Sequence, residues 1–139
     1  MLPGNGAMEA EAICCPIGAT DLDGIVAFAK EHKVDYAAVA PDDPLVLGCV
    51  DRLNELGIPC FGPKANAAII EGSKAFSKDL MKKYGIPTAK YEIFTELDKA
   101  LEYLKTAPIP TVVKAEGLAL GKGVIIAIPV MRPWRPSPT

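Results

Sequence analysis

Apolar residues recur with two different periods along the first half of the chain. In residues 20–33 (TDLDGIVAFAKEHK), Leu, Ile, Val and Ala stand at positions 22, 25, 26 and 29, a spacing that predicts an amphipathic helix. Thr20 or Asp21 can cap that helix at its start. Residues 34–40 (VDYAAVA) are nearly all apolar, as expected for a strand in a parallel sheet that is covered on both faces.

A second helix and a second strand are expected before residue 63. Residues 41–48 (PDDPLVLG) predict a loop that leads into a helix running through Asn54, and Gly57 is expected to end that helix. Residues 58–62 (IPCFG) predict the next strand. Strands that alternate with helices in this way predict an α/β fold with right-handed crossovers.

The second half of the chain continues the alternation. Residues 73–85 (SKAFSKDLMKKYG) predict an amphipathic helix, with Ser73 as its cap and Gly85 at its end. Residues 88–94 (TAKYEIF) predict a strand. Residues 95–105 (TELDKALEYLK) predict a further helix, which opens with the capping pattern T-x-x-D.

A hairpin is expected near the end of the regular pattern. Residues 111–115 (TVVKA) and 123–128 (GVIIAI) are two apolar segments that flank a glycine-rich loop, which predicts antiparallel strands. The boundary between two domains is placed within residues 62–72. The expected division is therefore a first domain over residues 1–72 and a second over residues 73–129.

Composition and charge exclude several classes of protein. Half of the 139 residues are apolar and 23% are charged, which is the balance of a soluble globular protein. The net charge of −2 gives no basic patch for nucleic acid. No apolar run approaches the roughly 20 residues of a membrane helix, and no signal-peptide pattern opens the chain. We therefore expect a cytoplasmic protein with no nucleic-acid or membrane partner.

The cysteines give no sign of a metal site. Cys14, Cys15, Cys49 and Cys60 form no C-x-x-C pair, and the single histidine, His32, cannot complete a usual zinc set with them. We expect reduced and mostly buried thiols. His32 lies near the end of a predicted helix, where a cation is favoured, and is expected to be a structural or surface residue.

Residues 116–123 (EGLALGKG) form the glycine-rich loop between the hairpin strands. Glycines let the backbone approach a ligand closely, and successive backbone N–H groups can hold phosphate oxygens. Lys122 and Lys114 would add positive charge. The pattern matches neither the P-loop nor the dinucleotide-binding fingerprint. On the pattern alone, a phosphate-binding loop and a hairpin tip with solvated lysines both remain open.

Four stretches of the chain resemble one enzyme family. Residues 71–91 (EGSKAFSKDLMKKYGIPTAKY), followed by residues 112–127 (VVKAEGLALGKGVIIA), closely resemble the phosphoribosylamine–glycine ligases, also called glycinamide ribonucleotide synthetases. Residues 40–63 (APDDPLVLGCVDRLNELGIPCFGP) resemble the family's G-P-E-x-P-L-V-x-G region, and residues 3–7 (PGNGA) resemble its P-G-N-x-G. The resemblance runs from about residue 3 to about residue 128.

The resemblance implies a fold and a reaction. The fold would be an incomplete Rossmann-like (pre-ATP-grasp) N-terminal domain followed by the first part of an ATP-grasp domain. The family uses ATP and magnesium to join glycine to 5-phosphoribosylamine in purine biosynthesis, through glycyl phosphate. Such chemistry depends on positioning and on neutralising charge around the transferred phosphoryl group. The full-length family is expected to be monomeric.

The resemblance also implies site residues. Lys74 and Lys114 match the two ATP-contacting lysines of the family and are expected to converge on one phosphate-sized site. The implied ATP-binding set is Lys74, Lys114, Glu116, Gly117, Leu118, Gly121, Lys122 and Gly123. The implied substrate-binding set is Pro3, Gly4, Asn5, Asp42, Pro44, Leu45 and Gly48. Glu116 replaces the usual aspartate and Asp42 the usual glutamate, so both positions keep a carboxylate.

The family pattern extends beyond both ends of the chain. The family's first strand and its G-x-G-G-R-E turn would precede residue 3, and its adenine-binding strand and magnesium carboxylates would follow the glycine loop. No catalytic residue and no metal ligand is therefore assigned here. We expect a fragment that has no ligase activity alone and is poorly stable. The alternatives are another ATP-grasp ligase or carboxylase, and a non-catalytic nucleotide-binding module.

Residues 130–139 (VMRPWRPSPT) are expected to be a tail outside the family pattern. They include three of the 13 prolines and the single tryptophan, and they show neither period. If Arg132 and Arg135 both use AGG codons, a shifted reading frame of residues 130–137 encodes a Glu-Ala-rich helix pattern. That pattern resembles what the family places after the last strand. The tail is thus expected to be frameshifted and to pack against nothing.

Overall fold

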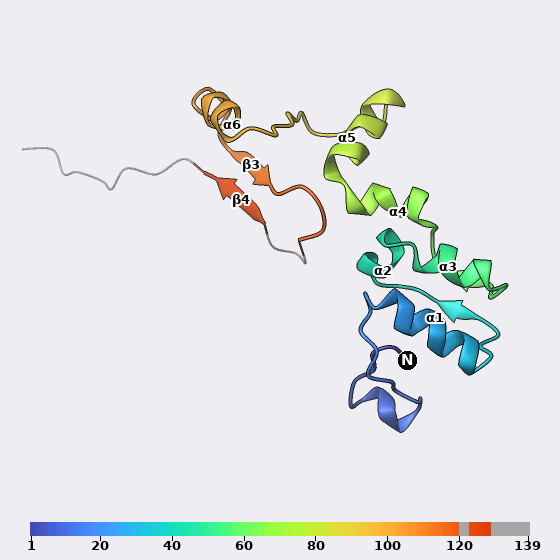
Figure 1. Ribbon diagram of the computed structural model, residues 1–139. Helices are drawn as coiled ribbons and strands as arrows, with labels where there is room; N and C mark the ends of the chain where they lie inside the picture. Colours follow the sequence, from blue (N-terminus) through green and yellow to red (C-terminus); the bar gives the residue numbers. More distant parts are fainter. Residues whose placement is uncertain (120–122, 129–139) are drawn as a thin grey trace, which may run out of the picture. The chain divides into compact units, whose positions relative to one another are not determined.

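The computed structural model describes residues 1–119 and 123–128 (Figure 1). The chain forms two compact units, Met1–Thr88 and Ala89–Thr139, and each is described by itself. The mixture of helices and strands agrees with a partial α/β fold. The expected tail over residues 130–139 lies outside the described residues.

Helix α1 (Leu22–Glu31) confirms the first predicted helix. Asp21 caps it: its carboxylate accepts a hydrogen bond from the backbone N–H of Gly24 at 3.0 Å. Such a cap satisfies one of the N–H groups that have no partner inside the helix. Ile25 and Ala29, one turn apart on the apolar face, are buried.

Strands β1 (Ala37–Ala38) and β2 (Cys60–Phe61) confirm the predicted parallel pair, in the register Ala37↔Cys60 and Ala38↔Phe61. Each strand has only two residues, so it is shorter than the apolar runs at 34–40 and 58–62 suggest. Both β1 residues and Phe61 keep solvent exposure. The pair therefore stands as a narrow parallel ribbon.

The connection between the two strands holds two helices, α2 (Asp42–Val46) and α3 (Cys49–Glu55). The predicted loop at 41–48 is therefore wrong over most of its length. Proline is tolerated in the first turn of a helix. The negative charges of two aspartates are stabilised by the partial positive charge at the helix N-terminus, so PDDPLV can begin a helix. Gly48, with φ +88°, separates α2 from α3. Gly57, with φ +78°, follows the end of α3 as predicted.

Two elements of the first unit have no counterpart in the predictions. A short 3₁₀ helix, η1, covers Met8–Ala10, and helix α4 covers Ala65–Gly72, where the domain boundary was expected. Helix α5 (Lys74–Lys83) confirms the next predicted helix. Ser73 caps it by accepting from the backbone N–H of Phe76 at 3.1 Å, and Gly85, with φ +67°, follows its end.

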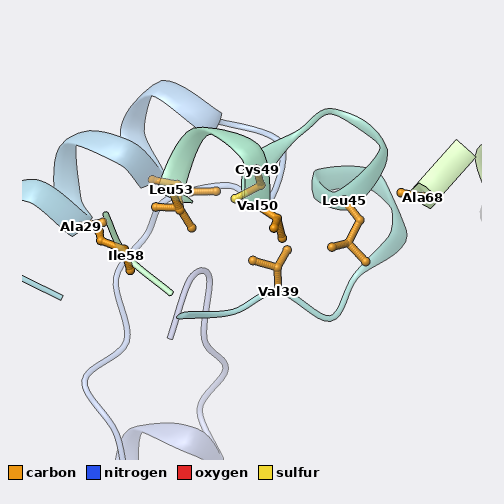
Figure 2. Close-up of a cluster of buried hydrophobic side chains, with 9 residues drawn as sticks. Ala29, Val39, Leu45, Cys49, Val50, Leu53, Ile58 and Ala68 are labelled. Carbon is orange, nitrogen blue, oxygen red and sulfur yellow. The ribbon is translucent and has the colours of Figure 1, made fainter. Parts of the chain in front are cut away.

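The buried core of the described residues lies in the first unit, between α1, α2, α3 and α4 (Figure 2). Its members come from both strand regions and all four helices: Ile25, Ala29, Val39, Leu45, Cys49, Val50, Leu53, Ile58 and Ala68. Gly62, with φ +140°, makes this packing possible. A Cβ there would lie 2.9 Å from both the carbonyl oxygen of Val39 and a methyl carbon of Leu45.

The second unit contains helix α6 (Leu97–Leu104) and an antiparallel hairpin of β3 (Thr111–Lys114) and β4 (Val124–Ala127). The hairpin confirms the prediction, with Thr111 opposite Ala127 and Lys114 opposite Val124. The predicted strand at 88–94 is wrong. A strand needs a ladder with a neighbour, and neither sheet formed by the described residues includes this segment.

The predicted capping pattern of the helix in the second unit is also wrong. Helix α6 begins at Leu97, so its cap position is Glu96 and not Thr95. Glu96 makes no capping hydrogen bond with its side chain and instead pairs with Lys99 at 2.6 Å. Thr95 stands one residue too early to accept from the first turn. The helix itself is confirmed.

Candidate functional site

The predicted substrate residues of the α2 region lie within one short segment. Asp42 opens α2 and its side chain is exposed, whereas Pro44 and Leu45, in the same turn, are buried. Gly48 is buried directly after the helix, in the left-handed conformation. Pro44 and Leu45 therefore fix the helix to the core, and among these four residues Asp42 has the side chain that can bind a ligand.

Pro3, Gly4 and Asn5 lie in a loop that folds back on itself. The amino group of Met1 donates to the carbonyl of Ile13 at 2.9 Å, and the N–H of Cys15 donates to the carbonyl of Met1 at 3.1 Å. A Cβ at Gly4 would lie 2.0 Å from the sulfur of Cys14, so only glycine fits this close approach.

Asn5 has a structural role inside the same loop. Its side-chain oxygen accepts from the N–H groups of Ala7 and Met8, at 3.1 and 3.2 Å, and so stabilises the turn that leads into η1. These contacts use the carbonyl end of the side chain and leave its amide NH₂ as the donor that could reach a ligand. The contacts of Gly4 and Asn5 are with residues 7–14, so their grouping with Asp42 stays a prediction.

Lys74 is the first residue of α5 and is half-buried. Ser73, just before it, is at once the last cap of α4 and the first cap of α5. Its N–H donates to the carbonyl of Ile69 at 2.9 Å, and its hydroxyl accepts from Phe76. Two helices thus meet at one residue, and this junction fixes the backbone from which the Lys74 side chain extends.

The glycine loop of the second unit is closed by the hairpin. Lys114 ends β3 opposite Val124, and the N–H of Ala115 donates to the carbonyl of Gly123 at 2.8 Å. Gly117 and Gly123 have φ of +81° and +73°, a conformation that glycine adopts without strain. A Cβ at Gly123 would lie 3.0 Å from that of Ala115. Both glycines are therefore required by the backbone of the loop.

The remaining predicted loop residues divide into two groups. Glu116 is exposed and Leu118 is half-buried. Gly121 and Lys122 lie outside the described residues. Lys74 and Lys114 belong to different compact units, so their convergence stays a prediction.

All four cysteines are free thiols; Cys49 is buried and the other three are half-buried. Burial raises the pKa of Cys49, the neighbouring thiol of Cys60 raises it further, and Arg52 lowers it. Burial also raises the pKa of Cys60, whose sulfur lies 3.3 Å from the carbonyl of Ile58. A raised pKa keeps a thiol protonated and unreactive, so these two cysteines serve the core and not nucleophilic chemistry.

Two negative findings apply to residues 1–119 and 123–128. No helix within these ranges is long and apolar enough to span a membrane. No group of three or more histidine, cysteine, aspartate or glutamate side chains in the same ranges could hold a metal ion.

Several residues that shape this region carried no signal in the sequence analysis. Asp51 on α3 accepts from the N–H of Ala65 at 2.8 Å and so caps α4 from another helix. Val46 packs against Gly72, where a Cβ would lie 3.0 Å from both valine methyl groups. Gly72 lies directly before Ser73 and Lys74 in the motif, and this position in the sequence was the signal that could have indicated its role.

Comparison with known proteins identifies, over the whole described chain, the family that the sequence motifs resemble. The model for the phosphoribosylglycinamide synthetase N domain matches residues 1–71, and the model for the phosphoribosylglycinamide synthetase ATP-grasp (A) domain matches residues 72–133. Phosphoribosylamine–glycine ligase of Allochromatium vinosum is 52% identical over 127 residues, which cover 90% of this chain and 30% of that protein.

Other curated relatives have the same name. The ligase of Halalkalibacterium halodurans is 49% identical over 126 residues, covering 91% of this chain and 29% of the relative. That of Escherichia coli is 48% identical over 128 residues, covering 91% and 30%. The chain thus spans about 30% of the length of the curated relatives that it matches.

Proposed function

Since the chain belongs to the phosphoribosylglycinamide synthetase family, we propose that its residues serve the ATP-dependent ligation of glycine to 5-phosphoribosylamine. The observation that carries this proposal is an identity of about half, over nine-tenths of the chain, to curated enzymes named for that ligation. The order of the motifs supports it, since the segment beginning at Asp42, the Ser-Lys pair at α5 and the glycine loop follow one another as the family requires.

The proposed reaction has two steps. A carboxylate oxygen of glycine attacks the γ-phosphorus of ATP, the bond to the ADP oxygen breaks, and glycyl phosphate forms. The amine of 5-phosphoribosylamine then attacks the carbonyl carbon of glycyl phosphate. Phosphate leaves with its bonding electrons, the nitrogen loses a proton, and the amide remains. The first step brings a carboxylate against the negatively charged phosphates of ATP, and the second builds negative charge on the carbonyl oxygen and the departing phosphate, so positioned cations lower both barriers.

In this reaction the two lysines would neutralise phosphate oxygens of ATP. An ammonium group is a compact charge that suits phosphate without demanding one geometry. Lys74 extends from a backbone that the junction of α4 and α5 holds, and Lys114 ends a hairpin strand. Gly117, Gly121 and Gly123 would let backbone N–H groups approach the phosphates, with Glu116, Leu118 and Lys122 in the same loop. That loop would keep water from glycyl phosphate.

The proposed ribose end of the site is the start of α2. The Asp42 carboxylate is exposed and would accept hydrogen bonds from ribose hydroxyls. Pro44, Leu45 and Gly48 would hold its backbone in place, and Pro3, Gly4 and Asn5 would line the same pocket. Magnesium supplies charge neutralisation at the phosphates when it is bound. A cytoplasmic location and a monomeric state, without membrane or nucleic-acid partners, belong to the same proposal.

A chimeric enzyme tests the proposal directly. The matching segment of the Allochromatium vinosum ligase is replaced by residues 3–128 of this chain, and glycine-dependent ADP release is measured with 5-phosphoribosylamine present. We expect ligation within about tenfold of the parent, as for exchanges among related sequences that keep the binding groups. A folded chimera that releases ADP no faster than a Lys74→Met version would refute the proposal.

A further inference from the structure

Helix α4 is held at its start by α3 and at its end by α2. At its start, Asp51 of α3 accepts from the N–H of Ala65 at 2.8 Å. At its end, Gly72 faces Val46, the last residue of α2. Between them, Ala68 is buried in the same core cluster as Leu45 of α2 (Figure 2). Helix α4 therefore has little freedom to shift against α2.

The contact at Gly72 is closer than a side chain normally allows. A Cβ there would lie 3.0 Å from each methyl carbon of Val46, and 3.6 Å from its Cβ. A separation of 3.0 Å is well inside the favourable distance of about 3.5–4.0 Å between carbon atoms. Val46 is next to Leu45, whose burial anchors α2 in the core. A methyl group added at Gly72 would therefore push α4 away from α2.

Such a shift would be transmitted to Lys74 within two residues. Ser73 donates its N–H to Ile69 and accepts from Phe76, and the hydroxyl of Ser77 donates to the carbonyl of Ile70. These bonds tie the start of α5 to the end of α4. The position of Lys74 relative to α2 therefore depends on how closely Gly72 approaches Val46.

We infer that Gly72 is a positioning residue, which sets Lys74 against the helix that begins with Asp42 through its contact with Val46. The inference rests on the proposed function, because it concerns the ATP-binding role of Lys74. Backbone conformation does not explain the glycine, because Gly72 lies in a helix and has no positive φ. The glycine is required by the neighbouring helix and not by its own turn.

A size exchange between the two positions tests the inference in the full 139-residue chain. Gly72→Ala, Val46→Ala and the double variant are compared with the parent by calorimetric titration with magnesium and ATP. We expect Gly72→Ala to weaken binding about fivefold or more and the double variant to return within about twofold, because removing the valine methyls restores the space. Gly18→Ala is the matched control, since a Cβ there meets no described atom within 4 Å.

Each outcome of these titrations supports or overturns the positioning role of Gly72. Recovery in the double variant supports positioning where the single Gly72→Ala chain is still fully folded, because a loss of folded protein then does not account for the weaker binding. Unchanged ATP affinity in a folded Gly72→Ala chain, with normal binding by the parent, overturns the inference and leaves the proposed function standing. A parent that binds ATP no better than Lys74→Met overturns the role of Lys74, and the inference with it.

Discussion

Asp51 of α3 caps α4 across a separation of 14 residues: its Oδ2 accepts from the backbone N–H of Ala65 at 2.8 Å. Lys64, at the cap position of α4, makes no capping bond with its side chain. The carboxylate therefore accepts a hydrogen bond from an N–H group that has no partner within the helix. Its negative charge also interacts favourably with the partial positive charge at the N-terminus of α4. One side chain thus joins two elements that local sequence alone does not connect.

Replacing Asp51 by alanine is expected to lower the free energy of unfolding by about 1–2 kcal/mol, the usual value of a lost cap. Asp51→Asn should lose less, because the amide oxygen can still accept the bond. Urea unfolding followed by circular dichroism measures both. Asn54→Ala, an exposed change on the same helix, is the control. Equal losses for Asp51→Ala and Asn54→Ala would show that the cap adds nothing.

Gly62→Ala is expected to cost about 2 kcal/mol or more, since it combines a disfavoured backbone conformation with overpacking. Its φ of +140° suits glycine, and the new Cβ would lie 2.9 Å from the carbonyl oxygen of Val39. Thermal unfolding compares it with Gly18→Ala, where open space predicts little change. A melting temperature shared by the two variants would mean that the core rearranges around residue 62.

The thiols of Cys49 and Cys60 predict a loss of stability in alkali. Burial raises the pKa of Cys49 and Cys60 in the folded chain above the ordinary value of 9.0. Below pH 9.0 both states keep their protons and the contribution is fully present. Above it the unfolded chain ionises first, so the free energy of unfolding falls as pH rises towards and through the raised pKa values.

Urea unfolding between pH 8 and pH 10.5 measures this dependence. The double variant Cys49→Ala/Cys60→Ala should show a shallower decline than the parent, because it lacks the two thiols whose pKa values folding raises. Alkylation by iodoacetamide gives a second readout: at these two positions it should be slower in the folded chain than in urea. Parallel stability curves for parent and double variant would contradict the prediction.

Lys74→Met is expected to weaken the binding of magnesium and ATP about tenfold, the effect of losing one charge-assisted contact to phosphate. Methionine keeps much of the apolar stem and removes the charge. Lys82→Met, exposed in the last turn of the same helix, makes the same chemical change away from the proposed site. Calorimetry compares the two, and equal affinities would mean that general charge attraction is sufficient.

Elements with local signals were predictable from sequence. Asp21 and Ser73 cap their helices with their own side chains, and glycines follow the ends of the predicted helices. The hairpin followed from two apolar runs around a glycine-rich loop. In each case the information lies within a few residues of the element, which is why reasoning from periodicity and turn chemistry succeeds there.

Elements that depend on distant partners were not predictable. Helix α4 is capped by Asp51 from another helix, and residues 88–94 have strand propensity but no place in either described sheet. The site shows the same limit. The motif identified Pro44 and Leu45 together with Asp42, but their roles differ. Pro44 and Leu45 are buried and anchor the helix, whereas Asp42 is exposed at its start. Burial is a property of the fold and cannot be read from the motif.

The shared junction at Ser73 has an electrostatic consequence for Lys74. A cation at the first position of an isolated helix faces the partial positive charge of unpaired N–H groups, an unfavourable arrangement worth roughly 0.3–1 kcal/mol. Here α4 ends at Gly72, two residues before Lys74, so its terminal carbonyl dipoles, with their partial negative charge, adjoin the same place. The end of one helix thus offsets the field at the start of the next, and a permanent positive charge is accommodated at the head of α5.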